Sequence, residues 1–444
     1  MSADVRPIRT AAEQSLAEAF AARKAGRAGD AFAPQREAAF RRFEAEGLPH
    51  RRIEDWKYTD LRALMREAKP LAGPPDAAGI ARAKNAGALA RSADARRLVL
   101  VDGAFVPELS DLAALEPGLT IVPMAQALAT GDQQVVRVLG TVVPTDDVAA
   151  ALNTAFMGDG VAVRLADGTR LARPIHLVFA YTATTAAAVF ARSLVVVGNG
   201  VRASLIESHE GPDDIDYQVN NALELVIGDD AHVDRVKIGL EGARALHIST
   251  LMAALGARAR LNDLSFTTGG AVVRNQLNVL FAGERASAAI GGASLLKGRQ
   301  HVDTTLVVDH AARGGTSREL FKSVLDGQSR GVFQGKIIVR PGAQQTDGRM
   351  MTRALLLSED AEADNKPELE IFADDVQCGH GATAGSLDQD LLFYLKTRGI
   401  PPQEAEALLI QAFVGEAIEA VEHQGLREAL MGAAAAWLQA REQA

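Results

Sequence analysis

A cysteine and a histidine two residues apart are the side chains in this sequence whose types and spacing best suit chemistry. Cys378 and His380 lie in residues 366–383, KPELEIFADDVQCGHGAT. On a β-strand, residues two apart place their side chains on the same face. Thiolate and imidazole groups are common ligands of iron–sulfur and zinc sites. The spacing therefore indicates a candidate metal or cluster site built on a strand.

Two ligands are too few for a cluster or a structural zinc ion, so such a site needs further donors. Water, the carboxylates of Asp374 and Asp375, or a second chain can supply them. Two other interpretations remain open for Cys378 and His380. One is ordinary packing and hydrogen bonding. The other is a nucleophilic pair, which would also need an orienting third group and an oxyanion site.

A second pair with strand spacing is formed by His301 and Asp303, and Asp309 and His310 follow shortly after. A carboxylate cluster on such a face would suit a β-helix enzyme that acts on polysaccharide. The alternative is a strand surface whose polar side chains are solvated or bonded to one another. The sequence contains no GxxxxGK[ST] motif, so it excludes ATP binding through a P-loop.

The elements that must position these residues fall into three parts: a helical region with a linker (1–96), a strand-rich core (97–385) and a helical tail (386–444). Within the first part, residues 8–65 have helical periodicity, and residues 66–96 have the Ala, Gly and Pro content of a loose linker. The core consists of short apolar runs separated by Gly, Asp and Asn. One helix is expected near 145–157, with Thr145 or Asp146 as its N-cap.

The core contains a weak internal repeat, in which an apolar strand ends at a glycine and small or apolar residues follow three and five positions later. The repeated glycines are Gly198, Gly228, Gly256 and Gly283, spaced 30, 28 and 27 residues apart. A near-constant period predicts a solenoid of stacked coils, with glycine at the corners because it adopts φ angles that other residues resist. A β-sandwich or barrel is the alternative, since both also contain many short strands.

The tail is expected to contain three helices, and its apolar residues cover more than one face. The first helix should end at Gly399, because Pro401 cannot continue it, and the others should occupy 402–421 and 425–441. Because the open ends of a solenoid need covering, the tail is expected to cap the solenoid, to dock a partner, or to do both.

The composition is that of an ordinary globular protein, with 444 residues, 48% hydrophobic and 23% charged. A net charge of −9 and a pI of about 5.6 argue against nucleic acid as the main partner. We expect no membrane helix and no secretory signal, and hence a cytoplasmic location. The single cysteine excludes an internal disulfide and an all-cysteine metal site within one chain.

Several segments resemble the SufB/SufD family of iron–sulfur cluster assembly scaffold proteins. The family's C-terminal signature is similar to residues 366–383, with further similarity at 387–388 and 393–400. Other matching segments are EDWKYT at 54–59, LNTAF at 152–156, DG at 159–160, PIHL at 174–177 and GVFQGKI at 331–337. The single cysteine and the short helical N-terminus favour the SufD branch over the SufB branch, whose members carry several cysteines.

The resemblance implies a right-handed parallel β-helix between N-terminal and C-terminal helical domains. It also implies a non-catalytic scaffold subunit that pairs with a SufB paralogue through the ends of their β-helices. The C-terminal helical domain would dock SufC, the ABC-type ATPase, so ATP hydrolysis would belong to that partner.

At the interface with SufB, the resemblance implies a transient iron–sulfur cluster. His380 would be the ligand that faces a SufB cysteine, and Cys378 would lie beside it as an auxiliary. The family complex has also been associated with reduced flavin, although the sequence contains no flavin motif. A homodimer that pairs these two residues across a two-fold axis, without SufC, is the alternative.

Overall fold

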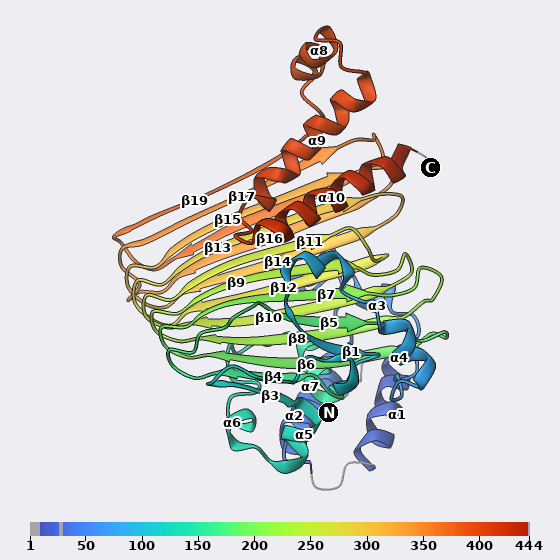
Figure 1. The fold of residues 1–444 in the computed structure, drawn as a ribbon, viewed down its shortest axis with the longest axis vertical. Helices are drawn as coiled ribbons and strands as arrows, with labels where there is room; N and C mark the ends of the chain where they lie inside the picture. The colour runs from blue at the N-terminus through green and yellow to red at the C-terminus, as the bar shows by residue number, and fades with distance from the viewer. Residues whose placement is uncertain (1–8, 26–29, 443–444) are drawn as a thin grey trace, which may run out of the picture.

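Successive strands of the core alternate between two sheets, so the chain winds as a flattened β-solenoid (Figure 1). The computed structural model describes residues 9–25 and 30–442; residue 8 and residues 26–29 of the expected helical region, and residues 443–444 of the tail, lie outside this part. The first sheet contains, in order, β2 (Ala104–Phe105), β1 (Arg96–Val101), β5 (Ile175–Ala180), β7 (Arg202–Glu210), β9 (His232–Leu240), β11 (Arg260–Thr267), β13 (Ser287–Leu296), β15 (Thr316–Leu325), β17 (Thr346–Leu356) and β19 (Val376–Gly385). The second contains β3 (Leu119–Pro123), β4 (Val161–Leu165), β6 (Ala188–Val197), β8 (Gln218–Ile227), β10 (Leu246–Leu255), β12 (Val272–Phe281), β14 (His301–His310), β16 (Arg330–Val339) and β18 (Glu362–Ile371).

Neighbouring strands pair in parallel throughout both sheets, except for the antiparallel pairs β1–β2 and β3–β4. The parallel register stacks equivalent side chains of successive coils inside the solenoid. One such row of buried aliphatic residues is Leu225, Ala253, Val279, Val308 and Ile337. Burial of each large aliphatic side chain contributes about 1.5–3 kcal/mol. The expected parallel β-solenoid is confirmed, and the sandwich and barrel are excluded.

The repeated glycines lie at the corners, but the expected reason was wrong. Gly283 does not have a left-handed φ angle; the left-handed residue lies two positions later, at Arg285, with φ of +58°. A Cβ atom at Gly283 would lie only 2.0 Å from the backbone nitrogen of Ala257 in the preceding coil. The other three glycines also leave too little room for a Cβ atom beside the preceding coil. Glycine is therefore needed because successive coils approach each other closely.

The helices are α1 (Ala11–Ala25), α2 (Ala33–Glu46), η1 (Glu54–Trp56), α3 (Leu61–Leu64), α4 (Ala77–Ala83), η2 (Ala88–Ala93), η3 (Pro107–Leu109), α5 (Met124–Thr130), α6 (Gln133–Val136), α7 (Val148–Phe156), α8 (Gln389–Thr397), α9 (Pro402–Ile418) and α10 (Gln424–Glu442). The segment expected to be a loose linker instead contains α4 and η2. Ser92 of η2 donates a hydrogen bond to the carbonyl oxygen of Gly425, which ties this segment to α10. Of the described helices, none is long and apolar enough to span a membrane.

The N-terminal helices cover the outer face of the second sheet. Phe20 of α1 stacks on Phe40 of α2 with ring centroids 3.9 Å apart, and both lie beside Phe156 of α7. Their cluster continues onto outward-facing residues of β10 such as Ile248. Asp147 caps α7 by accepting the N–H of Ala150 at 2.9 Å, so the expected caps one or two residues earlier were wrong.

The C-terminal helices α9 and α10 lie on the outer face of the first sheet (Figure 1). Their apolar residues Ile410 and Leu430 belong to the same buried cluster as Ile238 of β9 and Leu264 of β11. The helix α8 ends just before Gly399, whose φ is +87°, as expected. The tail therefore covers a face of the solenoid, and it leaves the end formed by β18 and β19 open.

Candidate functional site at the open end of the solenoid

The last strand of each sheet, β18 and β19, leaves one edge without a partner strand in the described part of the chain. Their residues are half-buried or exposed, whereas strands in the middle of the stack are almost wholly buried. Ile371, the last residue of β18, and Phe372, which follows it, are exposed apolar residues. Unpaired N–H and C=O groups on such an edge form a template for another strand.

Cys378 and His380 both lie on β19, at this open edge. In the parallel register, Cys378 pairs with Gly348 of β17 and His380 pairs with Met350. Met350 is buried in the solenoid core, so this register places both side chains on the inward-facing side of β19. Cys378 is half-buried against the core, whereas His380 is exposed. The two side chains therefore share one face, as their spacing indicated.

The local environment keeps the thiol of Cys378 protonated. Burial raises its pKa, and the negative charges of Asp347 and Glu319 act in the same direction, although a hydrogen bond from the backbone of Gly348 opposes them. A metal ion that binds this sulfur must therefore displace a proton. Asp374 and Asp375, which the sequence offered as further ligands, are exposed residues between β18 and β19.

Glu319 is a buried carboxylate of this site that sequence reasoning missed. In the register it shares a row with Met350 and His380, two strands inward from the open edge. Neither of its oxygens has a well-placed hydrogen-bond partner among the residues that the structure describes, and burial raises its pKa to about 8. The sequence feature that could have identified Glu319 is an acidic residue at one of the alternating strand positions that face the interior.

Comparison with known proteins agrees with this architecture. Residues 13–177 match the model of the SufBD protein N-terminal region, and residues 179–413 match that of the SUF system FeS cluster assembly, SufBD core domain. The chain belongs to the SufBD family. This confirms the resemblance drawn from the sequence motifs.

Relatives in this family cover most of the chain. It is 30% identical to the iron–sulfur cluster assembly protein SufD of Escherichia coli over 404 residues, which are 90% of this chain and 91% of that protein. It is 33% identical to an iron–sulfur cluster assembly SufBD family protein of Synechocystis over 385 residues, 84% of each chain. The protein is therefore a SufBD-family iron–sulfur cluster assembly protein close to SufD.

In this SufBD protein, the face around His301 and Asp303 is covered rather than open. Thr59 donates a hydrogen bond to Asp303 at 2.5 Å and lies 2.8 Å from the Nε2 atom of His301. Arg274 and Trp56 also pack there, and Asp303 is fully buried. The alternative of a carboxylate cluster suited to polysaccharide is therefore excluded, because the EDWKYT segment occupies this face.

Substituting Glu319 with glutamine should remove a pH dependence of stability. The folded-state pKa of about 8 lies above the ordinary value of 4.5, so the unfolded state releases this proton first as pH rises. The wild-type protein should therefore lose about 3–4 kcal/mol relative to E319Q between pH 5 and pH 8, since displacing a pKa by 1 is worth about 1.4 kcal/mol. Urea unfolding at both pH values measures this, with the exposed E359Q as control. Equal pH dependence in E319Q and the wild type would contradict it.

Proposed function

We infer that this chain is the SufD-type, non-catalytic subunit of a SUF scaffold, and that its open solenoid end pairs with the corresponding end of a SufB paralogue. The observation that carries this proposal is the unpaired edge of β18 and β19, with Cys378 and His380 beside it. Both sheets expose backbone hydrogen-bonding groups there, and a partner's strands would satisfy them.

The proposed cluster is a transient cargo of this interface. His380 would supply one ligand and a SufB cysteine another, with Cys378 as an auxiliary donor. Among the described residues, each group of three donor side chains close enough to share one ion lacks both Cys378 and His380. The donors of this chain at the open end are thus too few for a cluster, which supports completion by a second chain.

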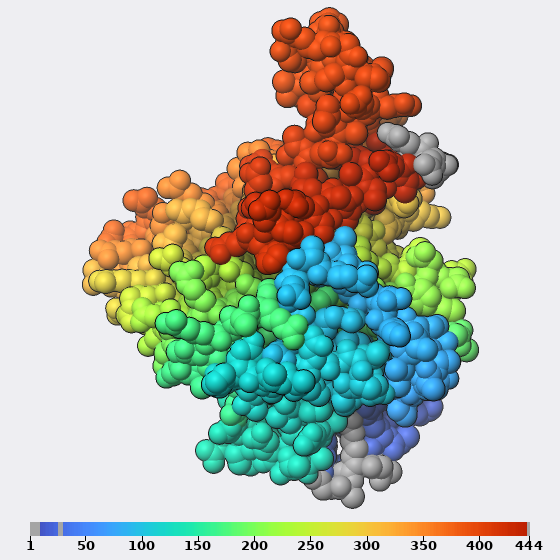
Figure 2. All heavy atoms as spheres, viewed as in Figure 1, coloured from blue at the N-terminus to red at the C-terminus, as the bar shows by residue number. Residues whose placement is uncertain are grey.

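The proposed docking surface for SufC is the projecting part of the C-terminal helices. Figure 2 shows α8 forming a projection beyond the rest of the molecule. Phe393 and Tyr394 on this helix are 69% and 52% exposed, and Leu391 is 51% exposed. Large apolar side chains gathered on a projection are typical of a protein–protein interface. ATP hydrolysis then belongs to SufC, and the proposal assigns no flavin site to this chain.

Substituting His380 with alanine should remove most of the cluster that forms on the complex, while the chain stays folded. His380 is exposed, so its loss leaves no cavity in the core. The measurement is anaerobic reconstitution with SufB, SufC, iron and sulfide, followed by visible absorption and assay of iron and sulfide per complex. C378S should have a smaller effect than H380A, and H50A serves as a histidine control from the N-terminal segment.

Two results would contradict this proposal. An unchanged cluster yield in H380A would show that His380 is not a ligand of the cluster. Recovery of the chain as a homodimer in the presence of SufB, measured by light scattering, would instead favour a site shared between two copies.

A further inference from the structure

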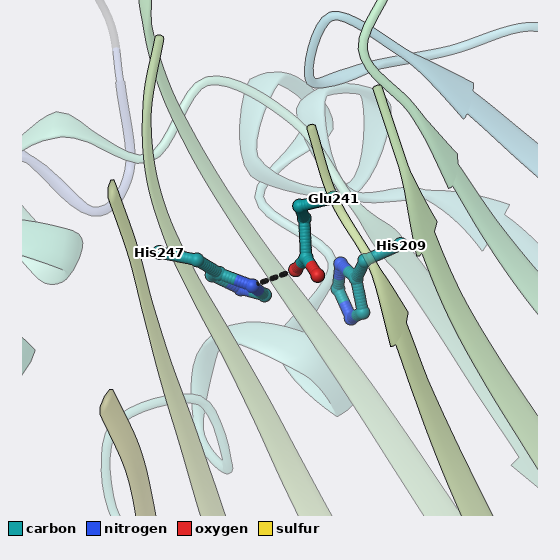
Figure 3. Close-up of side chains that lie close together, drawn as sticks. All are labelled: His209, Glu241 and His247. Carbon is teal, nitrogen blue, oxygen red and sulfur yellow. Dashed lines mark hydrogen bonds and ion pairs between the residues drawn. The ribbon is translucent and has the colours of Figure 1, made fainter. Parts of the chain in front are cut away.

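Three donor side chains meet inside the solenoid, away from its open end. His209 lies near the end of β7, Glu241 directly follows β9, and His247 is the second residue of β10. Figure 3 shows the carboxylate of Glu241 between the two imidazole rings. One donor atom of each residue lies within 4.8 Å of the others, and all three side chains are fully buried.

The cluster contains polar atoms that the surrounding protein does not satisfy. The Nδ1 atom of His247 contacts one oxygen of Glu241. The second oxygen of Glu241, and the Nε2 atom of His247, are buried without a hydrogen-bond partner among the described residues. Buried polar groups in folded proteins are nearly always satisfied, so two unpaired atoms in one cluster point to a missing ligand.

Among the described residues, no lysine or arginine forms a hydrogen bond or ion pair with Glu241, although the charge of the nearby Lys237 acts on it. Arg235 is shared by Glu207, at 3.0 Å, and Asp263, at 2.5 Å. Lys237 donates its hydrogen bond to Asn275 at 2.7 Å instead of to Glu241. A buried carboxylate without a cation of its own favours a positively charged ligand.

Both imidazole rings are fully buried, and each has a ring nitrogen within 4.8 Å of an oxygen of Glu241. His209 is oriented by Glu207, whose carboxylate lies 3.1 Å from its Nε2 atom. A carboxylate that orients a histidine is the usual support for a metal-binding imidazole.

We propose that His209, Glu241 and His247 bind one divalent transition-metal ion inside the solenoid. Two imidazoles and one carboxylate suit Zn²⁺, Fe²⁺ and Co²⁺, and the ion would contact the oxygen of Glu241 that has no hydrogen-bond partner among the described residues. This site is separate from the proposed cluster at the open end and does not depend on it.

A cavity at the surface lies close to this site. It has a volume of about 500 Å³, and its lining includes Tyr181 and Glu210. The hydroxyl of Tyr181 lies 3.3 Å from the Nδ1 atom of His209. Tyr181 therefore lies between the cavity and the buried donors.

The test is a titration of the full-length chain with Co²⁺ under anaerobic conditions, followed by visible absorption. It is made in the C378S/H380A background, so that the donors at the open end cannot contribute. We expect one Co²⁺ per chain, with an affinity about tenfold or more weaker in H247Q and in H209Q. H176Q is the matched control, because His176 is a buried histidine outside the cluster that contacts Ser208 at 2.8 Å.

A second measurement needs no substitution in the cluster, in case those variants do not fold. X-ray absorption of the Zn²⁺-loaded C378S/H380A protein should show scattering from two imidazoles. Failure to bind Co²⁺ in this background, or equal affinity in H247Q and H176Q, would overturn the proposal. Zn²⁺ without imidazole scattering would overturn it as well.

Discussion

Replacement of Arg274 by methionine should destabilise the protein by about 3–5 kcal/mol, the usual cost of leaving a buried charge without its partner. Arg274 lies on the outer face of β12 and forms a buried ion pair with Asp303. It also donates a hydrogen bond to the backbone oxygen of Asp55 at 2.7 Å, and its guanidinium lies 4.0 Å from the ring centroid of Trp56. One side chain thus ties the EDWKYT segment to the solenoid.

Chemical denaturation, monitored by tryptophan fluorescence, measures the effect of R274M. Trp56 is one of two tryptophans, so its emission also reports release of the segment. The double variant R274M/D303L should recover part of the lost stability, because it removes both charges. R340M is the control: Arg340 pairs with Asp309 at the surface, and such pairs contribute about 0–1 kcal/mol. Equal stability of R274M and R340M would contradict the assigned role.

Replacement of Gly283 by alanine should destabilise the solenoid by about 3 kcal/mol, at the upper end of the range for overpacking. The added Cβ would lie 2.0 Å from the backbone nitrogen of Ala257 and 2.2 Å from the carbonyl carbon of Gly256. Both are backbone atoms, so the clash can be relieved only if the two coils separate. Rotation of a side chain would not relieve it.

Two control variants separate this contact from backbone strain. G342A should change stability by less than about 0.5 kcal/mol, because no atom of the described residues lies within 4 Å of the position that the added methyl group would take, and the φ of Gly342 is not left-handed. R285G should also be nearly neutral, since glycine relieves a left-handed φ but adds freedom to the unfolded chain. Thermal unfolding measures all three variants. If R285G has a large effect and G283A has none, the left-handed φ angle determines the stability of the corner, and the close approach of the coils does not.

The repeat shows what a sequence pattern can and cannot predict. The spacing of the glycines predicted the solenoid because each coil repeats the same strand–corner unit. It did not give their physical role, because the atom that excludes a side chain at Gly283 belongs to a residue 26 positions earlier. The linker was mispredicted for a similar reason: η2 is ordered by its contact with Gly425, near the other end of the chain.

The candidate sites show the same difference between local sequence spacing and contacts made by distant residues. Cys378 and His380 share a face because of the two-residue period of a strand, which is a local property, whereas their roles as ligands stay predictions. Glu319 joins their row only through the register of β15, β17 and β19, which the sequence does not specify. The stacking of β7 on β9 brings His209 close to Glu241, and the corner between β9 and β10 brings His247 there, so no local spacing identifies the cluster.

The parallel stacking also determines where local unfolding of the solenoid begins. Each strand of the stack pairs only with the strands of the coil before it and the coil after it. Such a chain behaves as a one-dimensional array, in which local opening starts at an unprotected terminus and spreads from coil to coil. Fraying should therefore begin at β18 and β19 and fade toward β7. A protein bound over those two strands would suppress this local unfolding. It would therefore stabilise distant coils without any hinge between them.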